Sequence, residues 1–241
     1  MTKESKWYNP NRLFSHNAFI NFVMSPRGNG KSYSAKEKII KNYLKDGSQS
    51  VYVRRTKVEI DEIKDTYWND IQEAYPNLEF KVEGDIGYIN NDIVVYFIPL
   101  STSTNKKSAS YPKVKLIVFD EYIITKTTYN RYLKNEMTLL LDLIETIAAL
   151  LEAEGDKTKA SEFYERLADI DPKNRLALEK LADFRESIGD NYGAIEYMDR
   201  LKEIDPRNEF VQKNYDKIKD RAENGMGIMQ FLKSIFGKRM G

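Results

Sequence analysis

Residues 25–32, Ser-Pro-Arg-Gly-Asn-Gly-Lys-Ser, constrain the fold of this chain more than any other stretch. They follow an apolar run at residues 18–24 and precede a segment with helical periodicity, which is the context of a phosphate-binding P-loop. Glycines let several backbone N–H groups point at phosphate oxygens, and the positive end of the next helix points there too. The usual pattern opens with glycine, whereas this one opens with Ser25. A glycine-rich turn before a helix is the alternative; the preceding strand and the Lys-Ser ending favour a nucleotide site.

Two residues at the end of this loop carry chemistry. Lys31 is expected to reach the β- and γ-phosphates of a nucleotide. Ser32 is expected to hold Mg²⁺ through its hydroxyl, because this small ion prefers oxygen ligands in an octahedral shell and usually keeps several waters.

A short apolar strand at residues 115–119 supplies the second half of the expected site, because it ends in Asp120 and Glu121. In open α/β sheets, ligands bind at the carboxyl ends of such strands. Asp120 is expected to hold the water shell of Mg²⁺. Glu121 is expected to orient and activate the attacking water, because phosphoryl transfer depends mostly on positioning and charge stabilisation. Two solvated acids at a strand end are the alternative; with the P-loop upstream, an ATPase site is favoured.

Composition excludes several other kinds of site. The 241 residues include no cysteine and one histidine, His16, so disulfides and thiolate metal sites are excluded and a catalytic triad is implausible. Lys and Arg total 38 and Asp and Glu 37, so any DNA contact must be local. No run reaches the roughly 18 apolar residues of a membrane span. We expect a soluble protein in a reducing, cytoplasmic compartment.

Hydrophobic periodicity predicts an α/β P-loop domain with a small antiparallel β insert. Strands are expected at residues 18–24, 51–55 and 115–119, helices at 32–46 and 57–74, an antiparallel meander at 78–100 and a polar loop at 101–112. A loop of that length needs a functional explanation.

With these elements placed, residues 7–146 resemble the DNA-packaging ATPase, or encapsidation protein, of small podovirus-type tailed phages, a terminase-like P-loop motor. The matching segments follow the same order: residues 27–33, 51–55, 98–101, 107–112, 117–121 and 135–146. The resemblance implies a ring of identical subunits, assembled on a portal in the host cytoplasm. Such a ring couples ATP hydrolysis to moving double-stranded DNA into a procapsid.

The resemblance also implies roles for single residues. Lys31 and Glu121 are catalytic, and Ser32 and Asp120 bind Mg²⁺. The nucleotide-binding residues are Arg27, Gly28, Asn29, Gly30, Lys31, Ser32 and Tyr33. Arg27 is expected to contact phosphate or to sense the nucleotide.

Four basic residues are further candidates for contacts to phosphate or to a neighbouring subunit: Arg54, Arg55, Lys106 and Lys107. A solvated surface position is the alternative for each of them.

After Thr146 the resemblance ends. In the family, the helix leads to a basic segment with an arginine that acts on the neighbouring subunit's nucleotide, then to a sensor strand and a DNA-handling domain. The sensor strand is expected between the P-loop strand and the Asp-Glu strand, so its absence leaves a gap in the sheet. Buried backbone groups need partners, so the sheet must close another way.

The second half contains a repeat. Residues 170–174, Ile-Asp-Pro-Lys-Asn, recur as Ile-Asp-Pro-Arg-Asn 34 residues later, a period that resembles tetratricopeptide repeats. Helices are expected at residues 140–154, 157–169, 174–188, 191–203 and 208–222, so one continuous helix would cross the junction. We therefore expect an ATPase-like domain at 1–147 and an all-α repeat domain at 148–241, joined as a chimera of unrelated pieces.

The two halves leave two functions open. The first is an ATP-binding and hydrolysing packaging motor, truncated and fused. The second is a peptide-binding or scaffold module, because stacked repeats form a groove that holds a helical peptide. An amphipathic tail at residues 228–240 either caps the last repeat or lies on a membrane surface.

Overall fold

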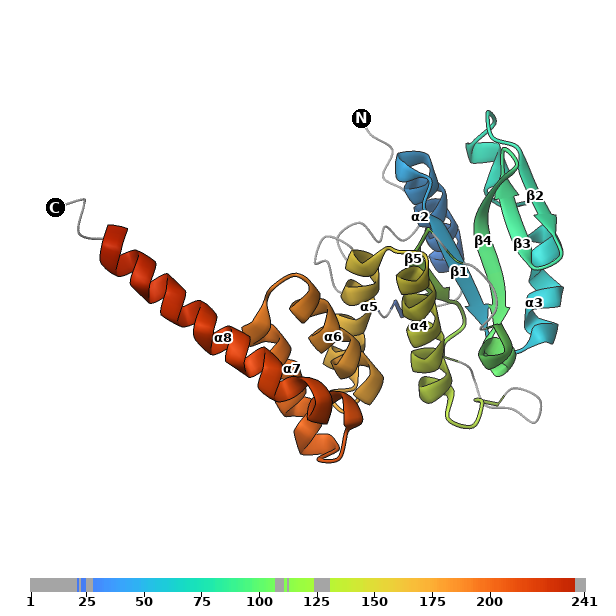
Figure 1. Cartoon of the computed structure of the whole chain (residues 1–241). Helices are drawn as coiled ribbons and strands as arrows, with labels where there is room; N and C mark the ends of the chain where they lie inside the picture. The colour runs from blue at the N-terminus through green and yellow to red at the C-terminus, as the bar shows by residue number, and fades with distance from the viewer. Residues whose placement is uncertain are drawn as a thin grey trace. The chain divides into compact units, whose positions relative to one another are not determined.

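The computed structural model describes residues 21, 23–24, 28–106, 111, 113–123 and 131–236. The chain divides into two compact units, Met1–Leu150 and Leu151–Gly241. The sheet belongs to the first unit and helices α5 to α8 belong to the second (Figure 1). The division falls within helix α4 (Glu136–Ala153), near the expected division after residue 147.

The first unit contains a mixed five-stranded sheet in the order β2-β3-β4-β1-β5. The strands are β1 (Gln49–Arg54), β2 (Phe80–Glu83), β3 (Ile86–Ile89), β4 (Asp92–Pro99) and β5 (Val114–Phe119). β1 is parallel to both β4 and β5, with Val53 opposite Ile98 on one side and Phe119 on the other. β2, β3 and β4 form the predicted antiparallel meander. The meander is not a separate insert, because β4 also pairs with β1 and all five strands form one sheet.

Helix α2 (Lys31–Asp46) confirms the helix predicted after the glycine-rich loop. It begins after Gly30 and ends at Gly47, which both adopt the left-handed conformation that favours glycine, with φ of 78° and 69°. Its buried residues Ile39 and Ile40 pack into an apolar core with side chains of β1 and β4. This packing places the first turn of α2 near the carboxyl end of β5.

Helix α3 (Lys57–Ile63) is much shorter than the predicted helix at residues 57–74. The chain continues as two 3₁₀ turns, η1 (Lys64–Thr66) and η2 (Gln72–Ala74). Tyr67 and Trp68 are only 2 % and 3 % exposed. Neighbouring side chains on a straight α-helix point about 100° apart, so both rings reach the core only because the helix ends before them.

The strand predicted at residues 18–24 lies partly outside the described residues. Asn21, Val23 and Met24 are described and belong to no strand, and Met24 is 73 % exposed. The prediction of a strand is wrong for these three residues. Among the described strands, β5 is the edge of the sheet beside β1. The described strands do not test how the sheet closes beyond β5. The expected gap in the sheet therefore stays a prediction.

The loop expected at residues 101–112 begins as a turn. η3 (Leu100–Lys106) is a 3₁₀ helix, and the Ser103 hydroxyl donates to the Leu100 carbonyl at 2.9 Å. Residues 107–110 and 112 lie outside the described residues.

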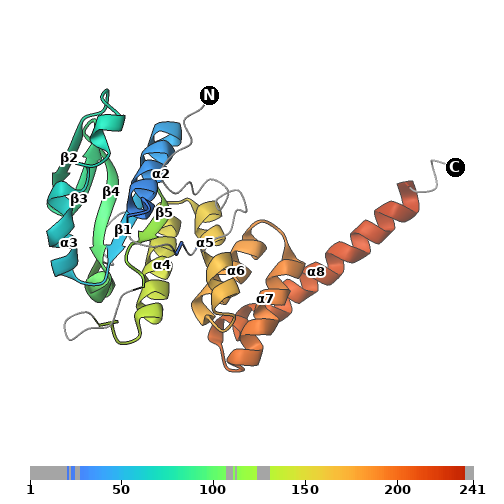
Figure 2. The ribbon, with the colours of Figure 1, turned by 180° about the vertical axis from the view of Figure 1, so that it is seen from behind.

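The helices of the second unit lie close to their predicted positions. They are α5 (Lys157–Ile170), α6 (Arg175–Ser187), α7 (Asn191–Ile204) and α8 (Glu209–Phe236). Each packs on the next along the chain (Figure 1 and Figure 2). α8 continues through Gly225 and Gly227 to Phe236, so the predicted end at residue 222 is wrong. None of the helices in the described part is long and apolar enough to cross a membrane.

Side-chain caps recur in this unit at the same spacing as the sequence repeat. Asp156 and Asp190 accept backbone N–H bonds three residues on, at the starts of α5 and α7. Asn174 and Asn208 do the same at the starts of α6 and α8. Such caps satisfy amides that have no partner within the helix. The recurrence supports repeated units; their identity as tetratricopeptide repeats stays a prediction.

Helix α4 crosses residues 146–149 without interruption, which confirms the prediction of a single helix there. Leu143, Ile147 and Leu151 are each at most 1 % exposed. Their spacing of four residues keeps one apolar stripe along the helix.

Candidate nucleotide site

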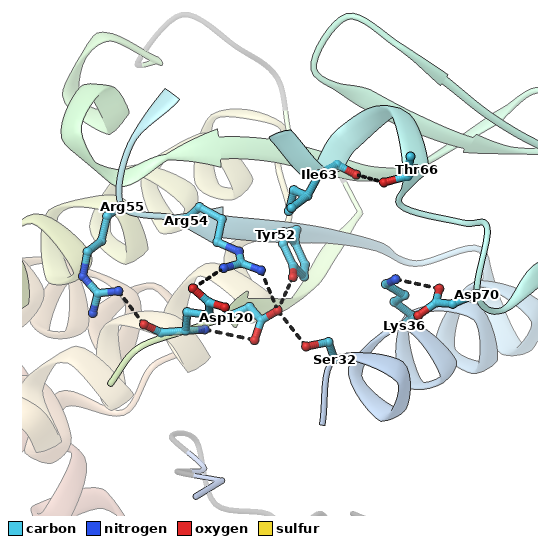
Figure 3. A network of polar contacts seen from close by, with 10 residues as sticks. Ser32, Lys36, Tyr52, Arg54, Arg55, Ile63, Thr66, Asp70 and Asp120 are labelled. Atoms are coloured by element: carbon cyan, nitrogen blue, oxygen red, sulfur yellow. Dashed lines mark hydrogen bonds and ion pairs between the residues drawn. The ribbon is translucent and has the colours of Figure 1, made fainter. Parts of the chain in front are cut away.

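The candidate site lies at the edge of the sheet where the parallel strands end. Ser32, in the first turn of α2, donates from its Oγ to Oδ2 of Asp120 at 2.9 Å, across 88 positions of sequence. Asp120 directly follows β5, and Arg54 ends the neighbouring strand β1. Figure 3 shows Ser32 of α2 and Tyr52 and Arg54 of β1 directed at Asp120. The structure therefore joins the two motifs that the sequence analysis combined.

Asp120 is held by several donors. Its Oδ2 also accepts from the Tyr52 hydroxyl and from Nη2 of Arg54, the latter at 3.1 Å. Its Oδ1 accepts the backbone N–H of Glu121 at 2.9 Å. The side chains of Asp120 and Arg54 are 12 % and 11 % exposed. A buried carboxylate needs such partners, since an unpaired buried charge is costly.

The two groups that donate to Asp120 from β1 keep their protons. Burial, and then the charge of Asp120, raise the pKa of Tyr52 above its usual range. Burial acts to lower the pKa of Arg54, but Tyr52, Asp120 and Glu121 together raise it above its ordinary value. Tyr52 therefore stays a neutral donor and Arg54 stays a cation.

Glu121 is placed differently from its neighbour. Its side chain is 54 % exposed, and its Oε2 lies 2.9 Å from Nη1 of Arg54. Its backbone has φ of 56°, in the left-handed region that few residues other than glycine adopt. Asp120 thus points into the protein, whereas Glu121 is turned toward solvent with one ion pair.

The start of α2 has the features of a phosphate site. Gly28 and Gly30 have φ of 82° and 78°. Gly30, which precedes α2, has no side chain that could cap the first amides, and a Cβ added at Gly28 would have no atom within 4 Å in the described part of the chain. Backbone amides at the positive end of a 16-residue helix suit the oxygens of a phosphate.

The oxygen donors fit a magnesium ion. Ser32 Oγ and Asp120 Oδ2 are 2.9 Å apart, and hydroxyl and carboxylate oxygens are ligands that Mg²⁺ accepts. The described residues contain no group of three or more metal-ligating side chains. This set therefore suits an ion that takes most of its ligands from water and phosphate, as Mg²⁺ does.

The remaining candidate site residues differ in their burial, and some of them lie outside the described part of the chain. Arg27 and Lys107, and the side chain of Lys106, lie outside the described part. Tyr33 is partly buried and packs against the apolar core. Arg54 and Arg55 are not solvated surface residues, since their side chains are 11 % and 1 % exposed.

The sequence analysis missed Tyr52 and Glu136. Tyr52 donates to Asp120, and Glu136 binds Arg55 through both carboxylate oxygens. The alternation in β1 could have indicated that Tyr52 and Arg54 share a face. No sequence signal connects Arg55 to Glu136, which is 81 positions away.

A family comparison agrees with this arrangement. The model of the family "Podovirus DNA encapsidation protein (Gp16)" matches residues 1–157, well over half of the chain. This chain belongs to that family. The match runs past Thr146, where the motifs quoted from the sequence end.

Individual relatives are phage packaging proteins. The DNA packaging protein of Bacillus phage phi29 is 40% identical over 144 residues, and that of Bacillus phage B103 is 42% identical over 135 residues. The matches cover 60% and 56% of this chain but 43% and 41% of the relatives. This chain therefore spans about two-fifths of the length of these relatives.

Solved structures give the same result for the fold. The N-terminal domain of the DNA packaging ATPase from bacteriophage phi29 matches with a TM-score of 0.56 and 40% identity, over 59% of this chain and 73% of that domain. The phi29 viral genome packaging motor assembly matches with a TM-score of 0.53 and 40% identity, over 59% of this chain and 43% of the other.

Proposed function

We propose that this chain binds ATP with Mg²⁺ and hydrolyses it, as a module of a phage DNA-packaging motor. The observation that carries the proposal is the hydrogen bond between Ser32 and Asp120, because it joins the glycine-rich helix start to the acidic strand end. A glycine loop or an acidic strand end alone has many other uses. Here the two features lie together at the carboxyl ends of parallel strands, in a member of this family. This combination favours phosphoryl transfer.

Each part of the edge has a task in this proposal. The amides at the start of α2 and the ammonium of Lys31 bind the phosphates. Ser32 and Asp120 hold Mg²⁺, which supplies charge neutralisation at the phosphate oxygens when it is bound. Glu121 orients a water molecule for attack on the γ-phosphorus, and the bond to the bridging oxygen breaks to release ADP and phosphate.

The polar network prepares Asp120 for this task. Three donors of the protein converge on its Oδ2 and hold the carboxylate at the carboxyl ends of the parallel strands. Arg54 also pairs with Glu121. Its guanidinium therefore lies between the carboxylates of two adjacent residues.

Nucleotide binding is tested by thermal unfolding in excess Mg²⁺ with and without ATP. A ligand at 100 times its dissociation constant stabilises the folded state by about 2.7 kcal/mol. We expect that stabilisation in the native chain and its loss in Lys31→Ala. Lys45→Ala is the matched control, because Lys45 lies in the last turn of the same helix and is exposed. Absence of any shift in the native chain refutes the proposal.

Larger partners follow from the family rather than from the described site. A ring of identical subunits, a portal and double-stranded DNA are therefore proposed as partners of the motor. The relatives are more than twice as long as the matched segment, so the ring and its DNA contacts depend on regions that this comparison does not cover. Sedimentation with and without Mg-ATP would measure whether this chain assembles by itself.

A second candidate function belongs to the helical unit. Its recurring caps and its consecutive packed helices are typical of repeat proteins, which hold peptides or partner helices in a groove. In this alternative the repeats form a peptide-binding scaffold and the nucleotide half is inactive. Capture of helical peptides by the full chain, but not after substitutions on α6, would favour it.

A further inference from the structure

Arg55 is an internal residue that joins three segments of the first unit. It directly follows β1, and its side chain is 1 % exposed. Its Nε and Nη2 donate to the two carboxylate oxygens of Glu136 at 2.8 and 2.9 Å. Its Nη1 and Nη2 also donate to the backbone carbonyls of Glu121 and Tyr122. The end of β1, the turn after β5 and the first turn of α4 thus meet at one guanidinium.

Glu136 is itself held in place. Its Oε2 also accepts the backbone N–H of Leu133 at 3.1 Å. The centroids of the Phe119 and Tyr132 rings lie 5.2 and 4.9 Å from the guanidinium carbon of Arg55. Both distances are within the range of cation–π attraction. A bidentate carboxylate and two aromatic rings suit the planar fork of arginine and not the point charge of lysine.

The turn that Arg55 binds has an unfavourable backbone conformation. Glu121 has φ of 56°, which lies in the left-handed region that is unfavourable for residues other than glycine. Such a conformation persists only when the surrounding structure holds it. The Arg55 bonds to the carbonyls of Glu121 and Tyr122 act directly on this residue and the next one.

We propose that Arg55 is a positioning residue for the reaction: with Glu136 behind it, it holds the backbone of Glu121 in the left-handed conformation that sets the carboxylate beside Arg54. The inference rests on the proposed role of Glu121 in orienting the attacking water. Arg55 contacts neither phosphate nor a neighbouring subunit in this proposal. It acts through the backbone of Glu121.

The kinetic test uses Arg55→Lys and Glu136→Gln, two variants that preserve most of the volume. Misplacement by about 1 Å can cost about a hundredfold in rate, so we expect kcat to fall about 10- to 100-fold. KM for Mg-ATP should stay within about threefold, because the phosphate-binding residues are unchanged. A rise in KM with unchanged kcat would overturn the proposal.

A double variant separates positioning from general weakening of the fold. If Arg55 acts through Glu121, Arg55→Lys should lower kcat by less than about twofold in a Glu121→Gln background, since the group it positions is gone. A merely structural role predicts the same loss in both backgrounds. Equal losses would therefore refute the proposal.

Amide hydrogen exchange tests the same idea without enzyme activity. In Arg55→Lys, the amides of residues 120–122 should exchange at least about tenfold faster, while those of α2 stay unchanged. Arg185→Met is the matched control, because Arg185 also binds two carboxylates, Glu165 and Asp190, but lies in the other unit. It should leave exchange at 120–122 and the kinetics unchanged.

The two readouts distinguish failure of this inference from failure of the proposed function. If the native chain neither binds nor hydrolyses Mg-ATP, the proposed function fails, and exchange still decides whether Arg55 holds the turn. If exchange at residues 120–122 is unchanged in both Arg55→Lys and Glu136→Gln, the positioning role is refuted, whatever the activity.

Discussion

Two sets of polar contacts, one from each unit, differ in how far apart their partners lie in the sequence. In the helical unit, Asp156, Asn174, Asp190 and Asn208 bind amides three residues away. In the sheet unit, Ser32 and Asp120 are 88 positions apart, and Arg55 and Glu136 are 81. The first kind of contact forms together with one helix turn. The second kind exists only when the whole sheet has folded.

This difference separates contacts that depend on the whole sheet from contacts that depend on a single helix turn. A cap works wherever its helix forms, so it can be repeated along a chain. A network such as that around Asp120 brings buried charges together and tolerates no missing member. Substitutions should therefore couple strongly at the sheet edge and add up in the helices.

The largest effect is expected at Asp120. Asp120→Ala removes the acceptor of four donors and leaves the buried Arg54 with Glu121, which is half exposed, as its ion-pair partner. Removing one partner of a buried ion pair costs about 3–5 kcal/mol; since Arg54 retains Glu121, we expect about 3 kcal/mol. Urea unfolding measures the loss.

Glu121→Ala is the matched control at the adjacent position. It removes the half-exposed partner of the same arginine, and exposed ion pairs contribute about 0–1 kcal/mol. If the two variants lose the same stability, the contrast between the buried and exposed carboxylates is wrong.

Smaller, additive effects are expected from the helix caps. Asn174→Ala and Asn208→Ala should each cost about 1 kcal/mol, because each removes an acceptor for an amide at a helix start. Together they should cost the sum within about 0.5 kcal/mol. Thermal or urea unfolding of the single and double variants measures this. A larger deviation would show that the caps are coupled and would weaken the comparison.

The smallest effect is expected where a long-range contact is exposed. Asp46 at the end of α2 accepts from Nζ of Lys115 in β5 at 2.9 Å, across 69 positions. This bond, and then one from Ser48, lower the pKa of Asp46 from 3.8 to about 2. A lowered pKa stabilises the fold above the unfolded-state value, and the contribution is lost as the pH falls from about 4 through about 2.

Unfolding of Asp46→Asn as a function of pH tests this. The native chain should be slightly more stable near neutral pH, and the difference should shrink toward pH 2. Added salt should reduce it too, because both side chains are more than one-third exposed. A difference that grows at low pH would show the opposite sign and exclude this cause.

The two units also differ in how well the sequence predicts their structure. The helices of the second unit depend on periodicity and caps within a few residues, so the bounds of α5, α6 and α7 were confirmed closely, whereas α8 runs 14 residues past its predicted end at residue 222. α3 was predicted too long because Tyr67 and Trp68 fit a helical face in sequence. Only the core of the folded sheet shows that both rings must be buried.

The candidate site shows the same limit. Ser32, Asp120 and Glu121 were predicted because each ends or begins a regular element, and the edge of a parallel sheet brings such residues together. The partner of Arg55 could not be predicted. The pair Arg54-Arg55 at the end of a buried strand indicates a functional site at that end of the sheet. It does not indicate that Arg55 pairs with a glutamate in a distant helix.

Helix α4 has a consequence for anyone who would cut or lengthen this chain. It runs unbroken from Glu136, which binds Arg55, to Ala153 beyond the boundary of the two units. A helix has a fixed phase, so adding or deleting one residue turns everything downstream by about 100° and shifts it by about 1.5 Å. The apolar stripe through Leu143, Ile147 and Leu151 would be split into two misaligned halves. Length changes here should be made in steps of seven residues, which come closest to restoring the phase.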